Sequence, residues 1–482
     1  MHALGAGMVN PTALQPMPTP LELLQQAFCL IKLGGDLLIV DRTDVNAVLA
    51  GTKLGRIDFY KSAAGEKLMR RFLENLPVQC DVKRTIADFW VSPATHVYTE
   101  IAFSPTQQPA TTLNYWVPNL IQPAQGNWDI IRAHIEDVIC SGNSTTYTYL
   151  INFLAHMLQH PEIKPGVMVV LLGKQGTGKG LFFQILQRIW PRTSLLVSDI
   201  NQVVGQFNAA LERNYIIIMD EAMFSGDRKS QDRMKSLVTE KTCHIEQKYQ
   251  PSRTIESVHR FFASSNHEHF SHVEADDRRS FFIRVSDLHQ GDHAYFAQLS
   301  VAIDDDQVIA AMIHDLLQID LSQFDIRSRP LTVEHANQKL KSLSGFDRFW
   351  CEVLMSGNFT FGQFNVDPWK LGDFVSTDKL VDDFNSYDKR SQKFAPTQSK
   401  EVSDAITRLC PSAVKARKVV NKSQQRGYKL PSLTTARQEF EHAYNCCIDW
   451  DDLDDADNDE TACDEAKPDE QQVAITATTC HE

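Results

Sequence analysis

The chain has 482 residues, of which 43% are hydrophobic and 23% charged, and its formal net charge is -13. This length and composition predict a folded protein of about three domains and exclude a disordered or fibrous one. No stretch approaches the roughly 18 consecutive apolar residues of a membrane span, and the N-terminus lacks the basic start and continuous apolar core of an export signal. We therefore expect a cytoplasmic protein with no membrane partner.

Cysteine and histidine usage gives no sign of a metal centre. The ten cysteines include no CxxC pair, and the 16 histidines show no ligand spacing, since the HEH at residues 267–269 fits a polar loop better. Reduced thiols and no zinc are expected.

Residues 1–112 predict a small α+β region. It mixes the apolar stretch at 31–40 with a helix-like segment at 67–76 and a turn at 88–93. Asp36 and Asp41 do not form the paired metal-binding carboxylates that primase chemistry needs. We expect no polymer synthesis by this chain alone.

A glycine-rich loop at residues 173–180 lies between an apolar run, 167–172, and a helix-like segment, 181–189. Glycines let the backbone amides turn toward a triphosphate, the helix N-terminus favours negative charge, and Lys179 can reach the β- and γ-phosphates. The predicted ATP-binding residues are Gly173, Lys174, Gln175, Gly176, Thr177, Gly178, Lys179 and Gly180. The alternative is an ordinary glycine turn.

The loop departs from the usual pattern at Gly180, where a Ser or Thr hydroxyl normally ligates Mg²⁺. Magnesium must therefore use other ligands. The apolar run 214–219 ends in Asp220 and Glu221, a Walker B signature. We assign Asp220 to the metal and Glu221 to the general base that polarises the attacking water. A helix cap after a buried strand is the alternative.

Further polar residues follow in the order that such a site needs. Asn266 follows an expected strand at 258–264, where its amide would orient water against the γ-phosphate, although an Asx turn is the simpler alternative. Arg278 and Arg279 precede the next expected strand, 281–285, and suit an arginine finger supplied to a neighbouring subunit. The alternative for these arginines is a salt bridge to Asp276 or Asp277.

Residues 243–256 read as a β-hairpin around a polar turn at 249–253. Lys248 and Tyr249 place a cation beside an aromatic ring, as a loop that follows a phosphate backbone needs. Without further context, a lysine on a hairpin is usually just solvated.

This order of motifs resembles superfamily 3 helicases, specifically the helicase part of phage, plasmid and poxvirus primase-helicases. The likeness extends to LNYW at residues 113–116, FLAHMLQHPEIKPG at 153–166 and RPLT near Pro330. It covers roughly residues 28–356 and is strongest to the helicase half of phage primase-polymerases, where a GTGKG ending also occurs.

The resemblance implies a three-layer α/β P-loop NTPase of the AAA+-like branch that assembles as a hexamer on DNA. It implies that helix-like segments at 128–140 and 146–159 form a collar before the ATPase. In that family the hairpin points into the ring channel and tracks single-stranded DNA. Lys248 and Tyr249 would then contact DNA.

The strongest basic patch, residues 413–429, contains six Lys or Arg and no acidic residue. It follows two amphipathic stretches, 377–387 and 400–409, and its RGYK run has strand character, so we expect a small winged-helix-like module. The candidates for holding duplex phosphates are Lys415, Arg417, Lys418, Lys422, Arg426 and Lys429. A solvated basic loop is the alternative.

The negative charge is concentrated at the C-terminus. Residues 449–482 contain 13 acidic residues and one lysine, so the rest of the chain is nearly neutral. Such a segment has few groups to bury and predicts a disordered tail, which either is merely solvated or competes with DNA for basic surfaces.

The predicted organisation is an α+β region at 1–112, a helical collar at 113–165, the ATPase at 166–330, a helical and winged-helix-like module at 331–448 and the tail at 449–482. We predict an ATP- and Mg²⁺-dependent DNA helicase of phage, prophage or plasmid-type replication in a bacterial host. Its expected partners are single-stranded and forked DNA, further copies of itself, and a separate primase or polymerase. An ATP-switched DNA-binding or loading protein and a nucleotide-dependent defence protein use the same motifs, and both stay open.

Overall fold

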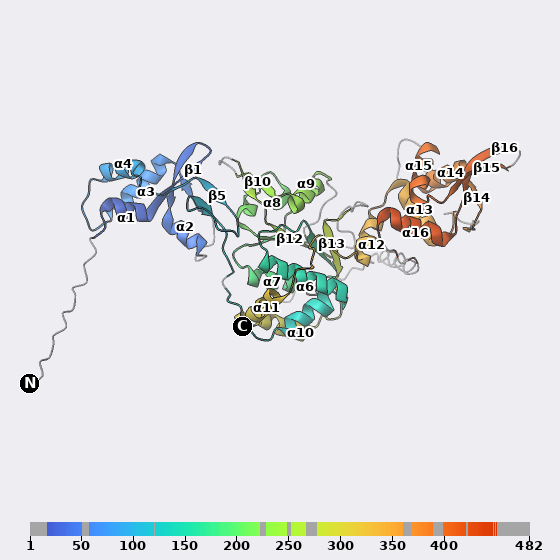
Figure 1. Cartoon of the computed structure of the whole chain (residues 1–482), viewed down its shortest axis with the longest axis horizontal. Helices are drawn as coiled ribbons and strands as arrows, with labels where there is room; N and C mark the ends of the chain where they lie inside the picture. The colour runs from blue at the N-terminus through green and yellow to red at the C-terminus, as the bar shows by residue number, and fades with distance from the viewer. Residues whose placement is uncertain are drawn as a thin grey trace, which may run out of the picture. The chain divides into compact units, whose positions relative to one another are not determined.

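The computed structural model describes residues 17–50, 57–119, 121–221, 228–247, 252–266, 277–359, 368–388, 399–420, 423–446, 448 and 450 (Figure 1). The chain divides into two compact units, Met1–Ser342 and Leu343–Glu482. Among the described helices, none has both the length and the apolar character needed to cross a bilayer.

The N-terminal part of the first unit is a small α+β layer structure. Its elements are α1 (Pro20–Ala27), β1 (Phe28–Leu33), β2 (Asp36–Asp41), α2 (Arg42–Leu49), β3 (Phe59–Tyr60), α3 (Ser62–Glu74), α4 (Val82–Val91) and β4 (Val97–Tyr98). The strands form one sheet in the order β3-β2-β1-β4, with Gly34 and Gly35 in left-handed conformations at the β1–β2 turn. Leu24, Met69 and Phe89 pack its core against β1 and β2.

The turn predicted at residues 88–93 is wrong over its first half, where α4 continues to Val91. Asp81 caps this helix by accepting from the Arg84 amide at 3.1 Å, and Ile86 and Phe89 bury its apolar face. Burial of that face, together with the cap, keeps residues 88–91 helical.

A short parallel pair, β5 (Glu100–Ala102) and β6 (Thr112–Asn114), leads to three helical segments. These are α5 (Asp129–Ala133), the π-helix η1 (His134–Ile139) and α6 (Ser144–Gln159). The two predicted helical segments are therefore confirmed, but the first of them changes from α to π geometry at His134.

Five parallel strands form the central sheet in the order β13-β7-β12-β9-β8. They are β7 (Met168–Leu172), β8 (Ser194–Val197), β9 (Ile216–Asp220), β12 (Arg260–Ser265) and β13 (Ser280–Arg284). The predicted strands agree with β7, β9, β12 and β13 to within two residues at each end. Both β7 and β12 are buried along their whole length, but only β7 is a continuous apolar run, because β12 begins with Arg260 and ends with Ser264 and Ser265.

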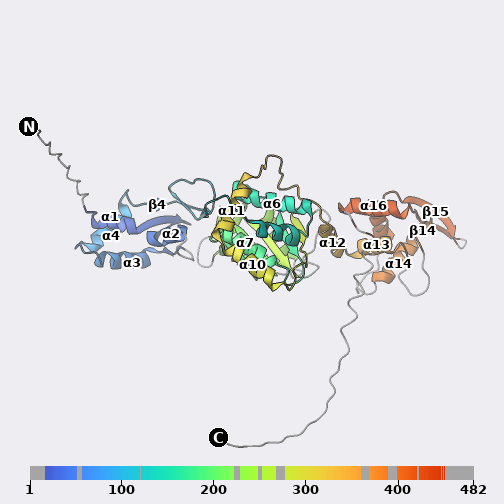
Figure 2. The ribbon, with the colours of Figure 1, turned by 90° about the horizontal axis from the view of Figure 1, so that it is seen from below.

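Helices cover both faces of this sheet. The remaining elements of the first unit are α7 (Lys179–Ile189), α8 (Asn201–Val204), the 3₁₀ helix η2 (Ala209–Arg213), α9 (Arg228–Thr239), β10 (Thr242–Ile245), β11 (Arg253–Glu256), α10 (His293–Asp304), α11 (Asp306–Gln318) and α12 (Val333–Lys341). Figure 1 shows α6, α7, α10 and α11 on one side of the sheet and α8 and α9 on the other. Figure 2, seen from below, shows the first four helices in front of the sheet.

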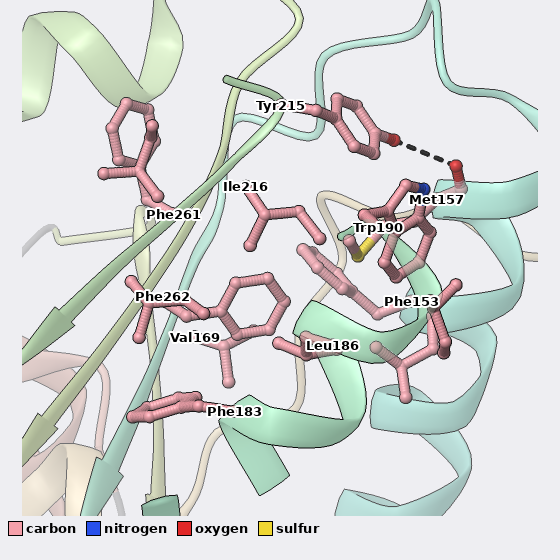
Figure 3. Packing of buried hydrophobic residues seen from close by; sticks show 14 of the residues in the cluster. Phe153, Met157, Val169, Phe183, Leu186, Trp190, Tyr215, Ile216, Phe261 and Phe262 are labelled. Atoms are coloured by element: carbon pink, nitrogen blue, oxygen red, sulfur yellow. Dashed lines mark hydrogen bonds between the residues drawn. The ribbon is translucent and has the colours of Figure 1, made fainter. Parts of the chain in front are cut away.

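The core between the sheet and α6 and α7 is aromatic and aliphatic. Figure 3 shows the labelled side chains of this layer, which include Phe153, Val169, Leu186, Ile216 and Phe262. The buried Tyr215 hydroxyl has a hydrogen-bond partner in this layer, because it donates to the Met157 carbonyl at 2.9 Å. Full burial of one such side chain stabilises the fold by about 1.5–3 kcal/mol, so this layer holds α7 firmly on the sheet.

The second unit contains α13 (Gly345–Ser356), β14 (Phe374–Ser376), α14 (Thr377–Asp388), α15 (Ser399–Leu409), β15 (Val414–Val420), β16 (Ser423–Lys429) and α16 (Leu433–Tyr444). Its sheet is antiparallel, in the order β14-β16-β15. A short strand, two helices and then a two-stranded hairpin is the order expected for a winged-helix-like module. The two predicted amphipathic helices coincide with α14 and α15.

Four described histidines of the first unit are buried: His335, which lies beside Asp277, and the three core residues His134, His156 and His259. Burial lowers the pKa of His134 and of His156 to about 4 and the pKa of His259 to about 3. All three are therefore neutral in the folded protein at pH 7.

These histidines predict that the first unit loses stability in mild acid. Below pH 6.5 the unfolded chain takes up protons that the folded chain does not, so each histidine removes up to about 1.4 kcal/mol of unfolding free energy per pH unit. Urea unfolding should show a lower midpoint at about pH 5.5 than at about pH 7.5, a range above the ordinary pKa values of the carboxyl groups. His156→Leu should reduce this pH dependence, and equal midpoints at both pH values would contradict the prediction.

Candidate functional site

The predicted site residues meet at the carboxyl edge of the parallel sheet. The strand β12 lies between β7 and β9, with Ser264 opposite Asp220 and Ser265 opposite Leu172. Because all three strands run in the same direction, the loops and side chains that follow them share one edge. The sheet order thus brings together three motifs that are spread over 94 residues of the chain, from Gly173 to Asn266.

The glycine-rich loop joins β7 to α7. Gly176 and Gly178 have φ values of 78° and 95°, in the left-handed region that favours glycine. Lys179 begins α7, and its ammonium donates to the carbonyl oxygens of Gly173 at 2.6 Å and Lys174 at 2.7 Å. Burial lowers the pKa of Lys179, whereas the nearby Asp220 and Glu221 act to raise it.

A cavity of about 330 Å³ opens over this loop. The predicted residues that line it are Gln175, Gly176, Thr177, Gly178, Lys179, Gly180, Asp220, Glu221 and Asn266. Of the other predicted loop residues, Gly173 lies against Val285, and Lys174 points to Asp287, with an Nζ to Oδ2 distance of 3.1 Å. Leu181, Gln184 and Phe296 also line the cavity and were missed, because a single glutamine or apolar residue within a helical segment gives no sequence signal for a ligand.

The two carboxylates are held by the neighbouring strand. The Ser264 hydroxyl donates to the Asp220 carboxylate, and the Asn266 amide donates to the Glu221 carboxylate. Glu221 has a φ of 52°, a backbone conformation that is uncommon outside glycine and is found at functional sites. Asn266 thus contacts the predicted base itself.

Asp220 offers the carboxylate that a nucleotide-bound magnesium ion needs, since Mg²⁺ in such sites takes one or two carboxylates, phosphate oxygens and water. Among the described residues no group of three or more His, Cys, Asp or Glu could hold a metal by itself. A Cβ atom added at Gly180 would meet nothing within 4 Å, so the missing hydroxyl leaves open space beside the loop. These residues fit an ion shared with a nucleotide.

Arg278 and Arg279 lie at the other end of the sheet. β13 pairs with β7 in parallel, from Ser280 opposite Met168 to Arg284 opposite Leu172. The backbones of Arg278 and Arg279, which directly precede Ser280, are therefore at least about 13 Å from the loop that follows Leu172. The Asp277 carboxylate accepts hydrogen bonds from the backbone amides of Arg279 and Ser280 at 3.3 and 3.2 Å. The structure therefore does not bring either arginine to the cavity of its own chain.

Asp277 also has charged partners at its side. The Arg329 guanidinium donates to the Asp277 carbonyl at 2.7 Å, and His335 Nε2 lies 3.5 Å from its carboxylate. Its pKa lies below the ordinary value although burial raises it, because His335, the Arg279 amide and Arg329 all favour the charged form. The side-chain partners of Asp277 are thus Arg329 and His335, which differ from the salt bridge considered for Arg278 or Arg279. Asp276 lies outside the described residues.

The predicted DNA-binding residues fall on two hairpins. The predicted hairpin at 243–256 is present as β10 and β11, paired from Thr242–Glu256 to Ile245–Arg253, but Lys248 and Tyr249 lie outside the described residues. On β15 and β16, the exposed predicted residues are Lys415, Arg417, Lys418, Arg426 and Lys429, and Lys422 lies outside the described part. Arg417 is directly opposite Arg426, an unfavourable like-charge pair that an anion would relieve.

Comparison with known proteins finds a family model, a curated relative and solved structures that are similar to this chain. Residues 171–279 match a model described as a family of unknown function, DUF5906. A 134-residue stretch is 34% identical to the DNA primase-polymerase of Nitratiruptor phage NrS-1, covering 27% of this chain and 18% of that protein. The chain thus aligns to less than a fifth of the length of this relative.

The similarity in structure extends further. The apo structure of the NrS-1 C-terminal region (305–718) has a TM-score of 0.60 at 15% identity, covering 85% of this chain and 97% of that one. The A form of the same region has a TM-score of 0.59 at 15% identity, covering 85% and 98%. At this identity the likeness shows a shared fold, and the expected resemblance to a phage primase-polymerase is confirmed at that level.

Proposed function

We propose that the chain is an ATP-dependent DNA helicase of the superfamily 3 type, which moves along single-stranded DNA as a ring during phage, prophage or plasmid-type replication. The observation that carries the proposal is the convergence of Lys179, Asp220, Glu221 and Asn266 on one cavity above the glycine-rich loop. A lysine, two carboxylates and an amide at the ends of three adjacent strands are the groups that phosphoryl transfer to water requires.

Each residue has a role in this proposal. The amides of residues 173–180 and the N-terminus of α7 hold the phosphates, and Lys179 leaves its carbonyl partners to contact the β- and γ-phosphates. Asp220 would hold Mg²⁺, which supplies charge neutralisation when bound. Glu221 accepts a proton from the attacking water, and the Asn266 amide positions Glu221 and then the γ-phosphate.

Arg278 and Arg279 are far from the cavity of their own chain. This position fits an arginine finger that acts in the cavity of a neighbouring subunit. An active site built between subunits is consistent with the proposed hexamer. The exposed basic hairpin of β15 and β16 and the similarity to a phage primase-polymerase support DNA as the partner and replication as the setting.

The proposal is tested with a forked duplex. Purified protein should separate the strands with ATP and Mg²⁺, and single-stranded DNA should stimulate hydrolysis. Lys179→Ala should do neither. ATP hydrolysis with DNA binding but without strand separation would overturn the motor and favour an ATP-switched loader, and absence of DNA binding would favour a nucleotide-dependent defence protein.

Gly180 provides a gain-of-function prediction. Because the position has open space, Gly180→Thr should place a hydroxyl near the ion and lower the Mg²⁺ concentration needed for half-maximal ATP hydrolysis by about three- to tenfold. Gly180→Ala is the matched control, since it adds the Cβ without the oxygen. Equal Mg²⁺ dependence for the Thr and Ala variants would show that no hydroxyl ligand is missing.

A further inference from the structure

His134 connects the helical segment before the central sheet to the glycine-rich loop. It is fully buried and lies at the first position of the π-helix η1, a rare geometry that is frequent at functional sites. The proposed chemistry uses no part of this segment. A buried polar side chain directed at the loop therefore requires an explanation.

Both ring nitrogens of His134 have partners. Nε2 lies 3.3 Å from the Gly178 carbonyl oxygen, and Nδ1 lies 3.0 Å from the Tyr295 hydroxyl. A carbonyl can only accept, so Nε2 carries the proton and donates to Gly178, and Nδ1 accepts from Tyr295. Burial lowers the pKa of His134 to about 4, which keeps this single tautomer present at neutral pH.

The ring also occupies the space beside Gly178. A Cβ atom at Gly178 would lie 2.5 Å from His134 Cε1 and 3.1 Å from Phe296 Cε1. The Gly178 carbonyl accepts from the Leu181 and Phe182 amides at 3.1 and 3.2 Å, so the same oxygen fixes the first turn of α7. His134 therefore contacts the junction at which the loop becomes the helix that carries Lys179.

The segment after β13 also contacts the loop. Gln290 donates to the Gln175 carbonyl at 2.8 Å, and the Asp287 carboxylate pairs with Lys174 at 3.1 Å. Tyr295, which orients His134, stacks on His289 with ring centroids 3.7 Å apart and an interplanar angle of 4°. The loop is thus held by His134 at Gly178 and by the segment after β13 at Lys174 and Gln175.

We propose that His134 is a positioning residue for nucleotide binding, which fixes the glycine-rich loop through Gly178 and is itself oriented by Tyr295. The inference deepens the proposed function and rests on it. Binding is strengthened because the loop amides already face the cavity and need not be ordered when the ligand arrives. His134 does not touch the nucleotide.

The test measures equilibrium binding of a fluorescent ATP analogue with Mg²⁺ to full-length variants. His134→Leu, which has no donor, should bind about tenfold more weakly, the loss expected for one hydrogen bond and some loop order. His134→Gln retains an N–H donor and should stay within about threefold of wild type. Tyr295→Phe should weaken binding by about threefold, because it frees the ring without changing the core shape.

His156→Leu is the matched control, since His156 is also buried, belongs to α6, and has no hydrogen-bond partner for its Nδ1 within the described part of the chain. It should bind as wild type does. In steady-state ATP hydrolysis, His134→Leu should raise KM and leave kcat within about twofold, whereas partial unfolding lowers the apparent kcat at constant KM.

Equal affinity of His134→Leu and wild type, or equal loss in the Leu and Gln variants, would overturn the positioning role and leave the proposed function intact. If His134→Leu does not fold, wild-type affinity in Tyr295→Phe would overturn it instead. Wild-type protein that does not bind the analogue at all would overturn both.

Discussion

Lys179→Ala is expected to lower the rate of ATP hydrolysis by at least about a hundredfold, the loss typical when a preorganised charge at the transferring phosphoryl group is removed. Lys179 is buried, sits at the start of α7 and is already directed at the loop. Lys179 is the positively charged side chain among the described residues that line the cavity, so its ammonium can stabilise the negative charge on the transferring phosphoryl group. Release of inorganic phosphate under saturating ATP and Mg²⁺ measures the effect.

The control for Lys179→Ala is Lys67→Ala, which removes an exposed lysine from α3. It should hydrolyse ATP at the wild-type rate. Thermal unfolding should show that Lys179→Ala is folded, since loss of the side chain leaves the apolar core of α7 unchanged. A Lys179→Ala protein that retains more than about half of the activity would place the chemistry elsewhere.

Glu221→Gln is expected to separate binding from chemistry. Removal of a general base lowers the hydrolysis rate by about 10²- to 10⁴-fold, while a neutral side chain of the same size leaves the loop and Lys179 in place. Affinity for ATP should stay within a few-fold of wild type. Binding of ATP by calorimetry and phosphate release, measured on the same preparation, provide the two values.

Glu240→Gln makes the same chemical change at an exposed position after α9 and should leave both values unchanged. Full hydrolysis by Glu221→Gln would contradict the role as base. If Glu221→Gln loses both ATP binding and hydrolysis, Glu221 would instead have a structural role as the partner of Asn266.

Much of the central fold is predictable from single segments. The strands β7 and β9 are buried along most of their length and appear as apolar runs, and the three apolar residues at the centre of β12 mark that strand less clearly. The glycine-rich loop is predictable because left-handed φ values at Gly176 and Gly178 favour glycine. The helix pair and hairpin of the second unit also follow from local patterns of charge and apolar spacing.

What the sequence does not contain is the spatial order of the strands. Nothing in residues 258–266 says that β12 lies between β7 and β9, yet this position brings Ser264 to Asp220 and Asn266 to Glu221. The strand β8 escaped prediction because it is short and Leu196 within it is 51% exposed. The bond from His134 to Gly178 joins residues 44 positions apart, and a histidine among the apolar positions of an amphipathic helix looks like a core residue.

For Arg278 and Arg279, the sequence predicts the position in the chain correctly, but the distance from the glycine-rich loop comes from the structure. Their place before β13 follows from the sequence, but only the parallel pairing with β7 shows that they lie at the far edge from their own loop. A finger role therefore requires a second copy of the chain, and it predicts that mixing inactive Lys179→Ala and Arg278→Ala/Arg279→Ala proteins restores some hydrolysis.

Binding of ATP with Mg²⁺, measured by isothermal titration calorimetry on wild type and Lys179→Ala, tests most directly whether the cavity above the loop is a nucleoside triphosphate site. Saturable binding of one nucleotide per chain by wild type, weakened at least about tenfold by Lys179→Ala, is the predicted result. Wild type without measurable binding, or binding that is unaffected by the loss of Lys179, would contradict the assignment of the site.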